Sequence, residues 1–163
     1  MLSFRTFIFF SSLFFYWGVA AQCELKGDDC RYYLCQAKVR NCRPQNYLKD
    51  FGYKYCQKFQ GANLSRFTSN GKVWLKEVRQ CLMKKLSEVS LDTTCDSLKL
   101  KAHFHHLECY YKKGFCDLYF SDREKVLELI SPELKRPEVI LSGLGLLLAC
   151  TTSDKLPDLM SPF

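Results

Sequence analysis

The sequence predicts an all-α, disulfide-stapled helical domain built around an antiparallel central helix pair. Apolar residues recur three or four positions apart over much of the chain, as they do along one face of a helix. Ten cysteines are present, and the evenly spaced Cys81, Cys95 and Cys109 mark the ends of two such helical patterns. A chain of 163 residues is long enough for one domain with a modest core.

Residues 1–21 are predicted to be a secretory signal peptide that is not part of the fold. Arg5 is the only charged residue among them, residues 6–17 are almost wholly apolar, and the small residues Val19 and Ala21 precede the predicted cut. An uncleaved membrane anchor is the alternative, but the apolar run is shorter than the ~20 residues that span a bilayer. We therefore expect a secreted, extracellular protein without a stable membrane anchor, or a periplasmic or otherwise exported one if the source is bacterial.

All ten cysteines follow the predicted cut, and an even number in an exported chain favours five disulfides. A metal site is a less favoured interpretation, because the sequence has no Cys-x-x-Cys motif. A catalytic cysteine would have to stay unpaired, and an even count leaves none obviously spare.

Basic residues outnumber acidic ones and give a formal net charge of +7. They are dispersed along the chain, with Lys84-Lys85 and Lys112-Lys113 as the densest positions. This pattern favours a solvated surface over a site for acidic glycans or lipid headgroups, and we expect no nucleic-acid partner.

Two helices are predicted at the start of the domain. Asp28 and Asp29 can cap a short helix that extends through Val39, and Pro44 ends this helix and opens the next. In the second helix an aromatic side chain recurs every four residues, which places the row on one face. We interpret the row as core packing, with an aromatic binding platform as the alternative. The row consists of Tyr47, Phe51, Tyr55 and Phe59.

A polar loop and the third helix follow. The loop contains the sequon Asn63-Leu64-Ser65, so Asn63 is a candidate glycosylation site if the source is eukaryotic. Residues 68–71 form a turn and a cap, and the third helix is predicted over residues 72–89. Arg79 and several lysines cover much of the side opposite its apolar face. That apolar face consists of Trp74, Val78, Cys81, Leu82 and Leu86.

The fourth helix is expected to begin at a cap formed by Asp92 or Thr93. Its apolar seam can lie against the third helix in an antiparallel hairpin. The seam consists of Cys95, Leu98, Ala102, His105 and Cys109.

Three histidines, His103, His105 and His106, lie in the fourth helix. A zinc site needs three or four ligands that converge on one point. Helical spacing places His103 and His106 on one side and His105 elsewhere, and no acidic or cysteine partner is obvious. We therefore interpret the histidines as surface or rim residues and expect no metal site.

The segment His106-Leu107-Glu108-Cys109-Tyr110 is similar to the His-x-x-Cys-Tyr stretch of secreted phospholipases A2. Members of that family hold calcium with an aspartate after the histidine and with a glycine-rich loop, and the sequence has neither. Without calcium ligands nothing stabilises the oxyanion of the reaction. We therefore expect no enzyme and no cofactor, and a phospholipase A2-like enzyme is the least favoured alternative.

Two more helices complete the predicted domain. Gly114 breaks the fourth helix, and Ser121-x-x-Glu124 is a capping box for a fifth helix that Ser131-Pro132 stops. Pro137 can open a sixth helix, whose apolar residues 139–149 are too few to span a bilayer.

The sixth helix is apolar all round and contains Gly143 and Gly145. We expect it to be buried in its own domain, with docking of a second copy as the alternative. The helical domain is expected to cover residues 22–150, and residues 151–163 to form a flexible C-terminal tail.

The chain resembles the stanniocalcins, a family of secreted, disulfide-rich helical glycoprotein hormones. The resemblance covers roughly Cys23 to Cys150, and the order of the cysteines is its specific part. Its motifs are Gly71-Lys72-x-Trp74-x-Lys76-Glu77 running to Cys81, the Cys95, Cys109 and Cys116 ladder with Glu108-Cys109-Tyr110, Cys30-x4-Cys35, Cys56-x-x-Phe59 and Leu147-Leu148-x-Cys150.

The resemblance implies a disulfide pairing, carried over by cysteine order. It pairs Cys23 with Cys35, Cys30 with Cys56, Cys42 with Cys95, Cys81 with Cys109, and Cys116 with Cys150. Two features depart from the family. Its additional cysteine that bridges a homodimer is absent, so we expect no covalent dimer, and Asn63 does not lie where the family's glycan is expected.

The resemblance also implies a function. Stanniocalcins are signalling or inhibitor proteins that act on calcium and phosphate handling and can bind pappalysin-type metalloproteinases. A protein partner, either a receptor or a metalloproteinase, is therefore expected. The alternative is an exported disulfide-rich helical protein of unrelated role.

Overall fold

The computed structural model describes residues 23–151, so the predicted signal peptide and residues 152–163 of the predicted tail lie outside the described range. Within that range the chain forms six α-helices and no strand, which confirms the all-α prediction. Thr151 is the last residue of the sixth helix and does not belong to the tail. The α-helices are α1 (Arg31–Val39), α2 (Lys54–Gln60), α3 (Ser69–Ser87), α4 (Cys95–Lys112), α5 (Phe120–Ile130) and α6 (Pro137–Thr151).

Four shorter helical segments connect these helices. The π-helix η1 runs directly into α2, so the two together form the predicted second helix. The other three are short 3-10 segments that change the direction of the chain. The four segments are η1 (Leu48–Tyr53), η2 (Ala62–Arg66), η3 (Phe115–Asp117) and η4 (Ser131–Glu133).

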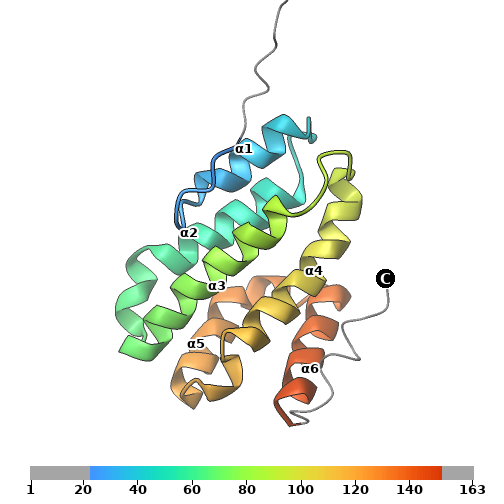
Figure 1. The fold of residues 1–163 in the computed structure, drawn as a ribbon. Helices are drawn as coiled ribbons and strands as arrows, with labels where there is room; N and C mark the ends of the chain where they lie inside the picture. Colours follow the sequence, from blue (N-terminus) through green and yellow to red (C-terminus); the bar gives the residue numbers. More distant parts are fainter. Residues whose placement is uncertain (1–22, 152–163) are drawn as a thin grey trace, which may run out of the picture.

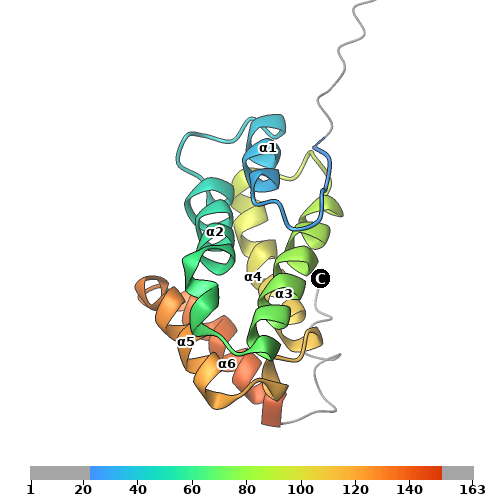
Figure 2. The same ribbon diagram turned by 90° about the vertical axis from the view of Figure 1, so that its left-hand side faces the viewer.

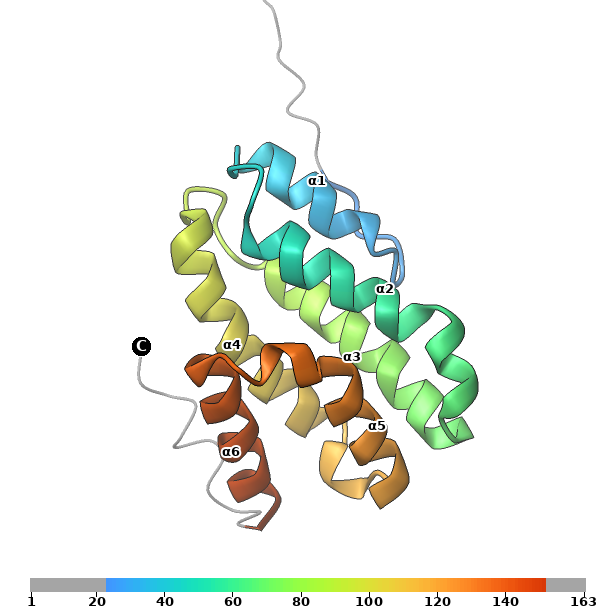
Figure 3. The same cartoon turned by 180° about the vertical axis from the view of Figure 1, so that it is seen from behind.

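The predicted central pair is present, because α3 and α4 pack as an antiparallel hairpin (Figure 1). On one side of this pair, α2 packs beside α3, η1 contacts α2, and α1 packs on η1. On the other side, α6 lies along α4. In the side view, α5 and α6 lie together at the end of the bundle that is remote from α1 (Figure 2). From behind, the chain passes from α5 through η4 into α6, and the two helices run in opposite directions (Figure 3).

Five disulfides use all ten cysteines and leave none free. They join the same pairs that the stanniocalcin resemblance implies. Their Cα atoms are 5.4–5.8 Å apart, as is usual for disulfides. Two pairs tie the N-terminal segment to α1 and α2, one ties the link after α1 to α4, one joins α3 to α4, and one joins η3 to α6. They are Cys23–Cys35, Cys30–Cys56, Cys42–Cys95, Cys81–Cys109 and Cys116–Cys150.

The first helix ends before Pro44, in a backbone motif that the sequence prediction did not include. Asn41 has a positive φ of 50°, and its N–H donates to the carbonyl of Lys38, while the N–H of Cys42 donates to Ala37. These two bonds form a Schellman motif with asparagine in the left-handed position. The motif directs the chain away from α1 before the proline is reached.

Two predicted caps are wrong. Thr94 caps α4, one or two residues later than predicted, because its hydroxyl accepts the N–H of Ser97 at 3.2 Å. The predicted box of Ser121 and Glu124 does not form, since α5 begins after Tyr119 without a side-chain cap. At the start of α3, by contrast, the Thr68 side chain accepts the N–H of Gly71, within the predicted cap segment.

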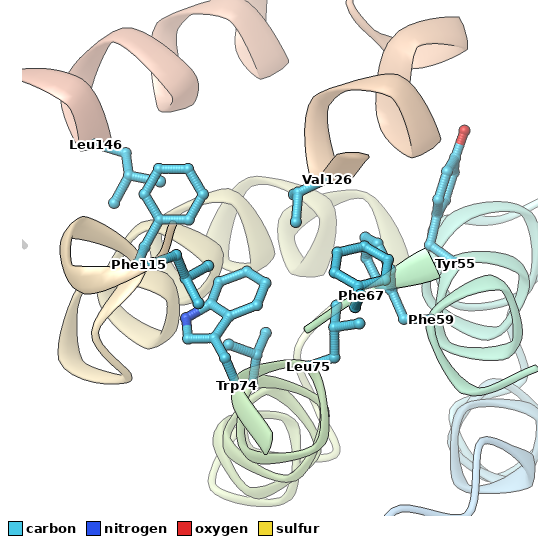
Figure 4. Packing of buried hydrophobic residues seen from close by; sticks show 10 residues of the cluster. Tyr55, Phe59, Phe67, Trp74, Leu75, Phe115, Val126 and Leu146 are labelled. Atoms are coloured by element: carbon cyan, nitrogen blue, oxygen red, sulfur yellow. The ribbon is translucent and has the colours of Figure 1, made fainter. Parts of the chain in front are cut away.

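The core consists of two clusters of buried side chains. The first lies among α1, η1, α3 and the first turn of α4, and the second lies where α2 and α3 meet α4, α5 and α6 (Figure 4). Tyr55 and Phe59 are buried in the second cluster, whereas Tyr47 and Phe51 are half-buried and pack against the clusters from outside, so the row is core in part. The second cluster consists of Tyr55, Phe59, Phe67, Trp74, Leu75, Val78, Phe115, Leu118, Val126 and Leu146.

Arg79 is a correction to the predicted solvated side of the third helix, because it is only 5% exposed. Its guanidinium donates to the carbonyl of Phe59 and to the carboxylate of Asp28, each at 2.5 Å. Asp28 therefore pairs with α3, and it is Asp29 that accepts the N–H of Arg31 at the start of α1. Helical periodicity alone could not distinguish a buried, paired arginine from the solvated lysines around it.

Candidate functional site on the last three helices

The sixth helix exposes one apolar face, which corrects the prediction that the helix is buried. It packs on α4 through Val139, Leu146 and Ala149, and the side that points away from α4 is open. The opposite side consists of Ile140, Leu141, Leu144 and Leu148, which we call the outer apolar face. Leu141 is 68% exposed and Leu148 is 61% exposed. Such a cluster of large exposed aliphatic side chains is typical of an interaction site.

The two glycines of α6 lie in different surroundings. A Cβ at Gly145 would meet the side chain of Leu107 of α4 at 3.7 Å, which is ordinary contact. A Cβ at Gly143 would have nothing within 4 Å. The open space beside Gly143 belongs to a cavity.

This cavity lies among α4, α5 and α6 and has a volume of about 370 Å³. Pockets that hold small molecules usually have about 300–1,000 Å³. Most of the lining is apolar, including Leu107, Phe115, Val126 and Leu146. Four further lining residues are themselves largely exposed and therefore lie at the mouth, namely Phe120, Leu127, Leu134 and Leu147.

Few polar side chains line the cavity, and two of them have unpaired atoms. Within the described residues, Nε2 of His103 and Nε of Arg123 are buried and have no hydrogen-bond partner. Ser142 is satisfied, because its hydroxyl donates to the carbonyl of Glu138 at 2.9 Å. Glu124 is the acidic residue of the lining and is exposed to solvent.

His106 also lines the cavity, where it is half-buried and packs among aromatic rings. Its ring lies 5.6 Å from that of Phe51 and 5.7 Å from that of Tyr110. Nδ1 lies 2.6 Å from the carbonyl oxygen of Ala102 and must carry the proton, since a carbonyl only accepts. Burial lowers the pKa of His106 to about 4, so the ring is neutral near pH 7.

The other two histidines are half-buried as well. Burial lowers the pKa of both His103 and His105 below its ordinary value. Within the part of the chain that the structure describes, no group of three or more histidine, cysteine or acidic residues could hold a metal ion.

The predicted glycosylation site lies away from these features. Asn63 is in η2, between α2 and α3, and its side chain is not among the described ones. Leu64 packs against the second core cluster, and Ser65 is exposed. Glycosylation of Asn63 therefore stays a prediction.

Arg123 was not singled out by the sequence analysis, although its position carries a signal. Phe120, Arg123 and Leu127 are three and four residues apart and thus share one side of α5. An arginine inside an apolar stripe indicates either a buried pair or a ligand. Within the described residues, Arg123 forms no ion pair with any acidic residue.

No protein-family model, curated protein or solved structure matches this chain. Among residues 23–151, none of the helices combines the length and the apolar character needed to cross a membrane.

Proposed function

We propose that this chain is a secreted, stanniocalcin-like signalling or inhibitor protein that acts by binding another protein. Two observations support the assignment to this class. The motifs around Trp74 and Cys109 resemble those of the family, and the five disulfides join the pairs that the resemblance implies. Five disulfides in a chain of this length are typical of extracellular proteins, because the cytosol keeps thiols reduced.

The outer apolar face of α6 is the observation that favours protein binding. Its four aliphatic side chains lose contact with water only if a partner covers them, and burial of apolar area is the main driving force of association. The helix is also held in place, because Cys150 near its end is bonded to Cys116. A helix fixed in this way loses little conformational entropy on binding, which favours affinity. The partner is a receptor or a pappalysin-type metalloproteinase, and the role is in calcium and phosphate regulation.

The phospholipase A2-like alternative has less support. In such a reaction the histidine must accept a proton from water beside a calcium ion. His106 instead points its protonated Nδ1 at the carbonyl of Ala102, and aromatic rings surround it. The next residue is Leu107, which cannot ligate calcium.

Direct binding to a purified pappalysin-type metalloproteinase tests the proposal, with inhibition of its proteolysis as the second readout. We expect Leu141→Lys and Leu148→Lys to weaken binding about tenfold or more, since each would place a charge in an apolar contact. Leu100→Lys is the matched control, because Leu100 lies on α4 and is 62% exposed. Equal losses in all three variants would contradict a specific role of α6.

Two other outcomes would overturn the proposal. The first is a wild-type protein that neither binds nor inhibits the metalloproteinase. The second is calcium-dependent release of fatty acid from phospholipid by the purified protein that disappears in His106→Ala. This result would assign the chain to the enzyme class.

A further inference from the structure

We propose that the cavity among α4, α5 and α6 binds a single-chain amphiphile with an anionic head, such as a fatty acid or a lysophosphatidic acid. The apolar chain occupies the interior of the cavity, and the head accepts hydrogen bonds from Arg123. This inference is independent of the proposed protein partner, because none of the four residues of the outer apolar face lines the cavity.

The shape and chemistry of the cavity fit an alkyl chain. Its volume is about 370 Å³, and side chains such as Phe115, Val126 and Leu146 form its inner wall. Phe120 and Leu127 at the mouth are exposed, so the apolar surface continues from the interior to the outside. An extended apolar ligand that is partly covered by the protein would remove both surfaces from water.

Arg123 determines the charge of the proposed head. The guanidinium is permanently charged and can only donate hydrogen bonds. Its Nε is buried without a partner, and a buried N–H without an acceptor is unfavourable. A carboxylate or a phosphate would supply the missing acceptor and the opposite charge. Nε of the buried Arg79 lacks a partner as well, but the terminal nitrogens of that guanidinium are paired with Asp28 and the carbonyl of Phe59, whereas the described part of the chain supplies no carboxylate to Arg123.

Two other polar residues of the lining are consistent with such a head. Nε2 of His103 is a second buried atom without a partner and can donate to an oxygen of the ligand. Glu124 has the wrong charge for an anion, but its side chain is exposed to water, which screens it. The proposal therefore predicts unequal effects for the two neighbouring residues Arg123 and Glu124.

The first test fills the cavity without disturbing the helix. Gly143 lines the cavity and has open space where a Cβ would lie, so Gly143→Leu places a side chain inside it. Titration calorimetry with palmitate should show one saturable site in the wild type and at least a tenfold loss of affinity in Gly143→Leu, since the leucine occupies the space of several methylenes. Gly143→Ala is the matched control and should retain most of the affinity.

The second test separates the head from the chain. Arg123→Met should lower the affinity for palmitate and the affinity for lysophosphatidic acid about tenfold each, because a hydrogen bond to a charged group is lost. The same variant should leave the affinity for hexadecanol unchanged, because hexadecanol has an alkyl chain like that of palmitate but no charge. Glu124→Gln, the matched control, should change palmitate affinity by less than about twofold, because the carboxylate is exposed. Comparison of palmitate with lysophosphatidic acid shows which head the site prefers.

Near-ultraviolet circular dichroism identifies variants that keep the wild-type packing, and only these are compared. The proposal is overturned if palmitate and lysophosphatidic acid both fail to bind the wild type, or if Gly143→Leu binds them unchanged. It is also overturned if hexadecanol binds as tightly as palmitate and if Arg123→Met lowers the affinity for hexadecanol as much as the affinity for palmitate. Loss of metalloproteinase binding in Gly143→Leu, with no lipid bound by the wild type, would assign the cavity to the protein interface instead.

Discussion

Gly71 of α3 lies directly against the buried carboxylate of Asp122 of α5, so that a Cβ at position 71 would lie 2.5 Å from Oδ2 of Asp122. Asp122 is fully buried and accepts the backbone N–H of Thr68 at 3.1 Å as well as the Thr68 hydroxyl. The same hydroxyl accepts the N–H of Gly71. A carboxylate at the first turn of α3 also interacts favourably with the helix dipole. This contact fixes where α5 docks on the central hairpin.

We expect Gly71→Ala to destabilise the protein by about 1–3 kcal/mol, because the added methyl group would displace a fully buried carboxylate. Gly143→Ala, in open space on α6, should instead stabilise by up to about 1 kcal/mol through its higher helix propensity. Denaturant unfolding of both variants, with the disulfides intact, gives the comparison. Equal free energies of unfolding would show that Asp122 moves aside without cost.

The contact between Gly71 and Asp122 also shows what the sequence could not predict. Local patterns are sufficient for the helices themselves, since periodicity and the residues Thr68, Gly114 and Pro137 define most of their limits. The same local logic assigned the start of α5 to a box of Ser121 and Glu124. Asp122, which lies between them, forms the hydrogen bonds instead, and its partner Thr68 lies 54 positions away. No local pattern contains that information.

The candidate site on the last three helices could not be predicted from the sequence for a related reason. An apolar helix is usually interior, but among the described residues α6 packs mainly on α4, so five of its seven valine, isoleucine and leucine side chains are exposed. Whether a second neighbour exists depends on where α5 docks. The unpaired Nε of Arg123 likewise depends on the distance to every acidic residue in the folded chain. The surroundings of His106 depend on tertiary packing in the same way, because its ring packs against that of Phe51 from η1.

Arg79 should be essential for stability although it is a charged residue. Arg79→Met would leave the carboxylate of Asp28 and the carbonyl of Phe59 without their donor, and breaking a buried pair costs about 3 kcal/mol or more. Lys76→Met on the exposed side of α3 is the control and should change stability by less than about 0.5 kcal/mol. Denaturant midpoints and slopes provide the measurement. A loss of similar size in both variants would mean that the pair contributes nothing specific.

Acid should destabilise the protein through His106. Its pKa is about 4 in the folded state, against 6.5 for an unperturbed histidine. Above pH 6.5 both states hold a neutral ring, so His106 contributes no pH dependence there. As the pH falls from 6.5 towards 4, only the unfolded chain takes up the proton, and the free energy of unfolding decreases by up to about 3 kcal/mol.

His106→Phe keeps an aromatic ring in the cluster and removes the titration, so the loss of stability in this window should shrink. The pKa values of His103 and His105 are lowered as well, and some acid sensitivity should therefore remain. Thermal unfolding between pH 7 and pH 4 measures the effect, and His105→Gln, which removes a less perturbed histidine, should change the pH profile less than His106→Phe. An unchanged pH profile in His106→Phe would place the acid sensitivity in other groups.

Folding should depend on the disulfides. The five bonds connect residues that are 12 to 53 positions apart, and each contributes about 3–4 kcal/mol in the loop-entropy model. The total stability of a domain is only about 5–15 kcal/mol. Full reduction should therefore abolish the near-ultraviolet circular dichroism at room temperature. A reduced protein that still melts cooperatively with native-like signals would contradict this expectation.

The chain should not form a disulfide-linked dimer, because every cysteine already has a partner within the chain. Thiol-blocked protein should run as a monomer in non-reducing electrophoresis, and a dimer band that reductant removes would show that the five-pair framework is wrong.

The outer apolar face could still join two copies without a covalent bond. If the face binds a different protein and not a second copy of the chain, light scattering should give a constant monomer mass over a range of concentrations. A mass that doubles, and reverts in Leu144→Lys with unchanged helicity, would instead assign this face to self-association, since Leu144 lies at its centre.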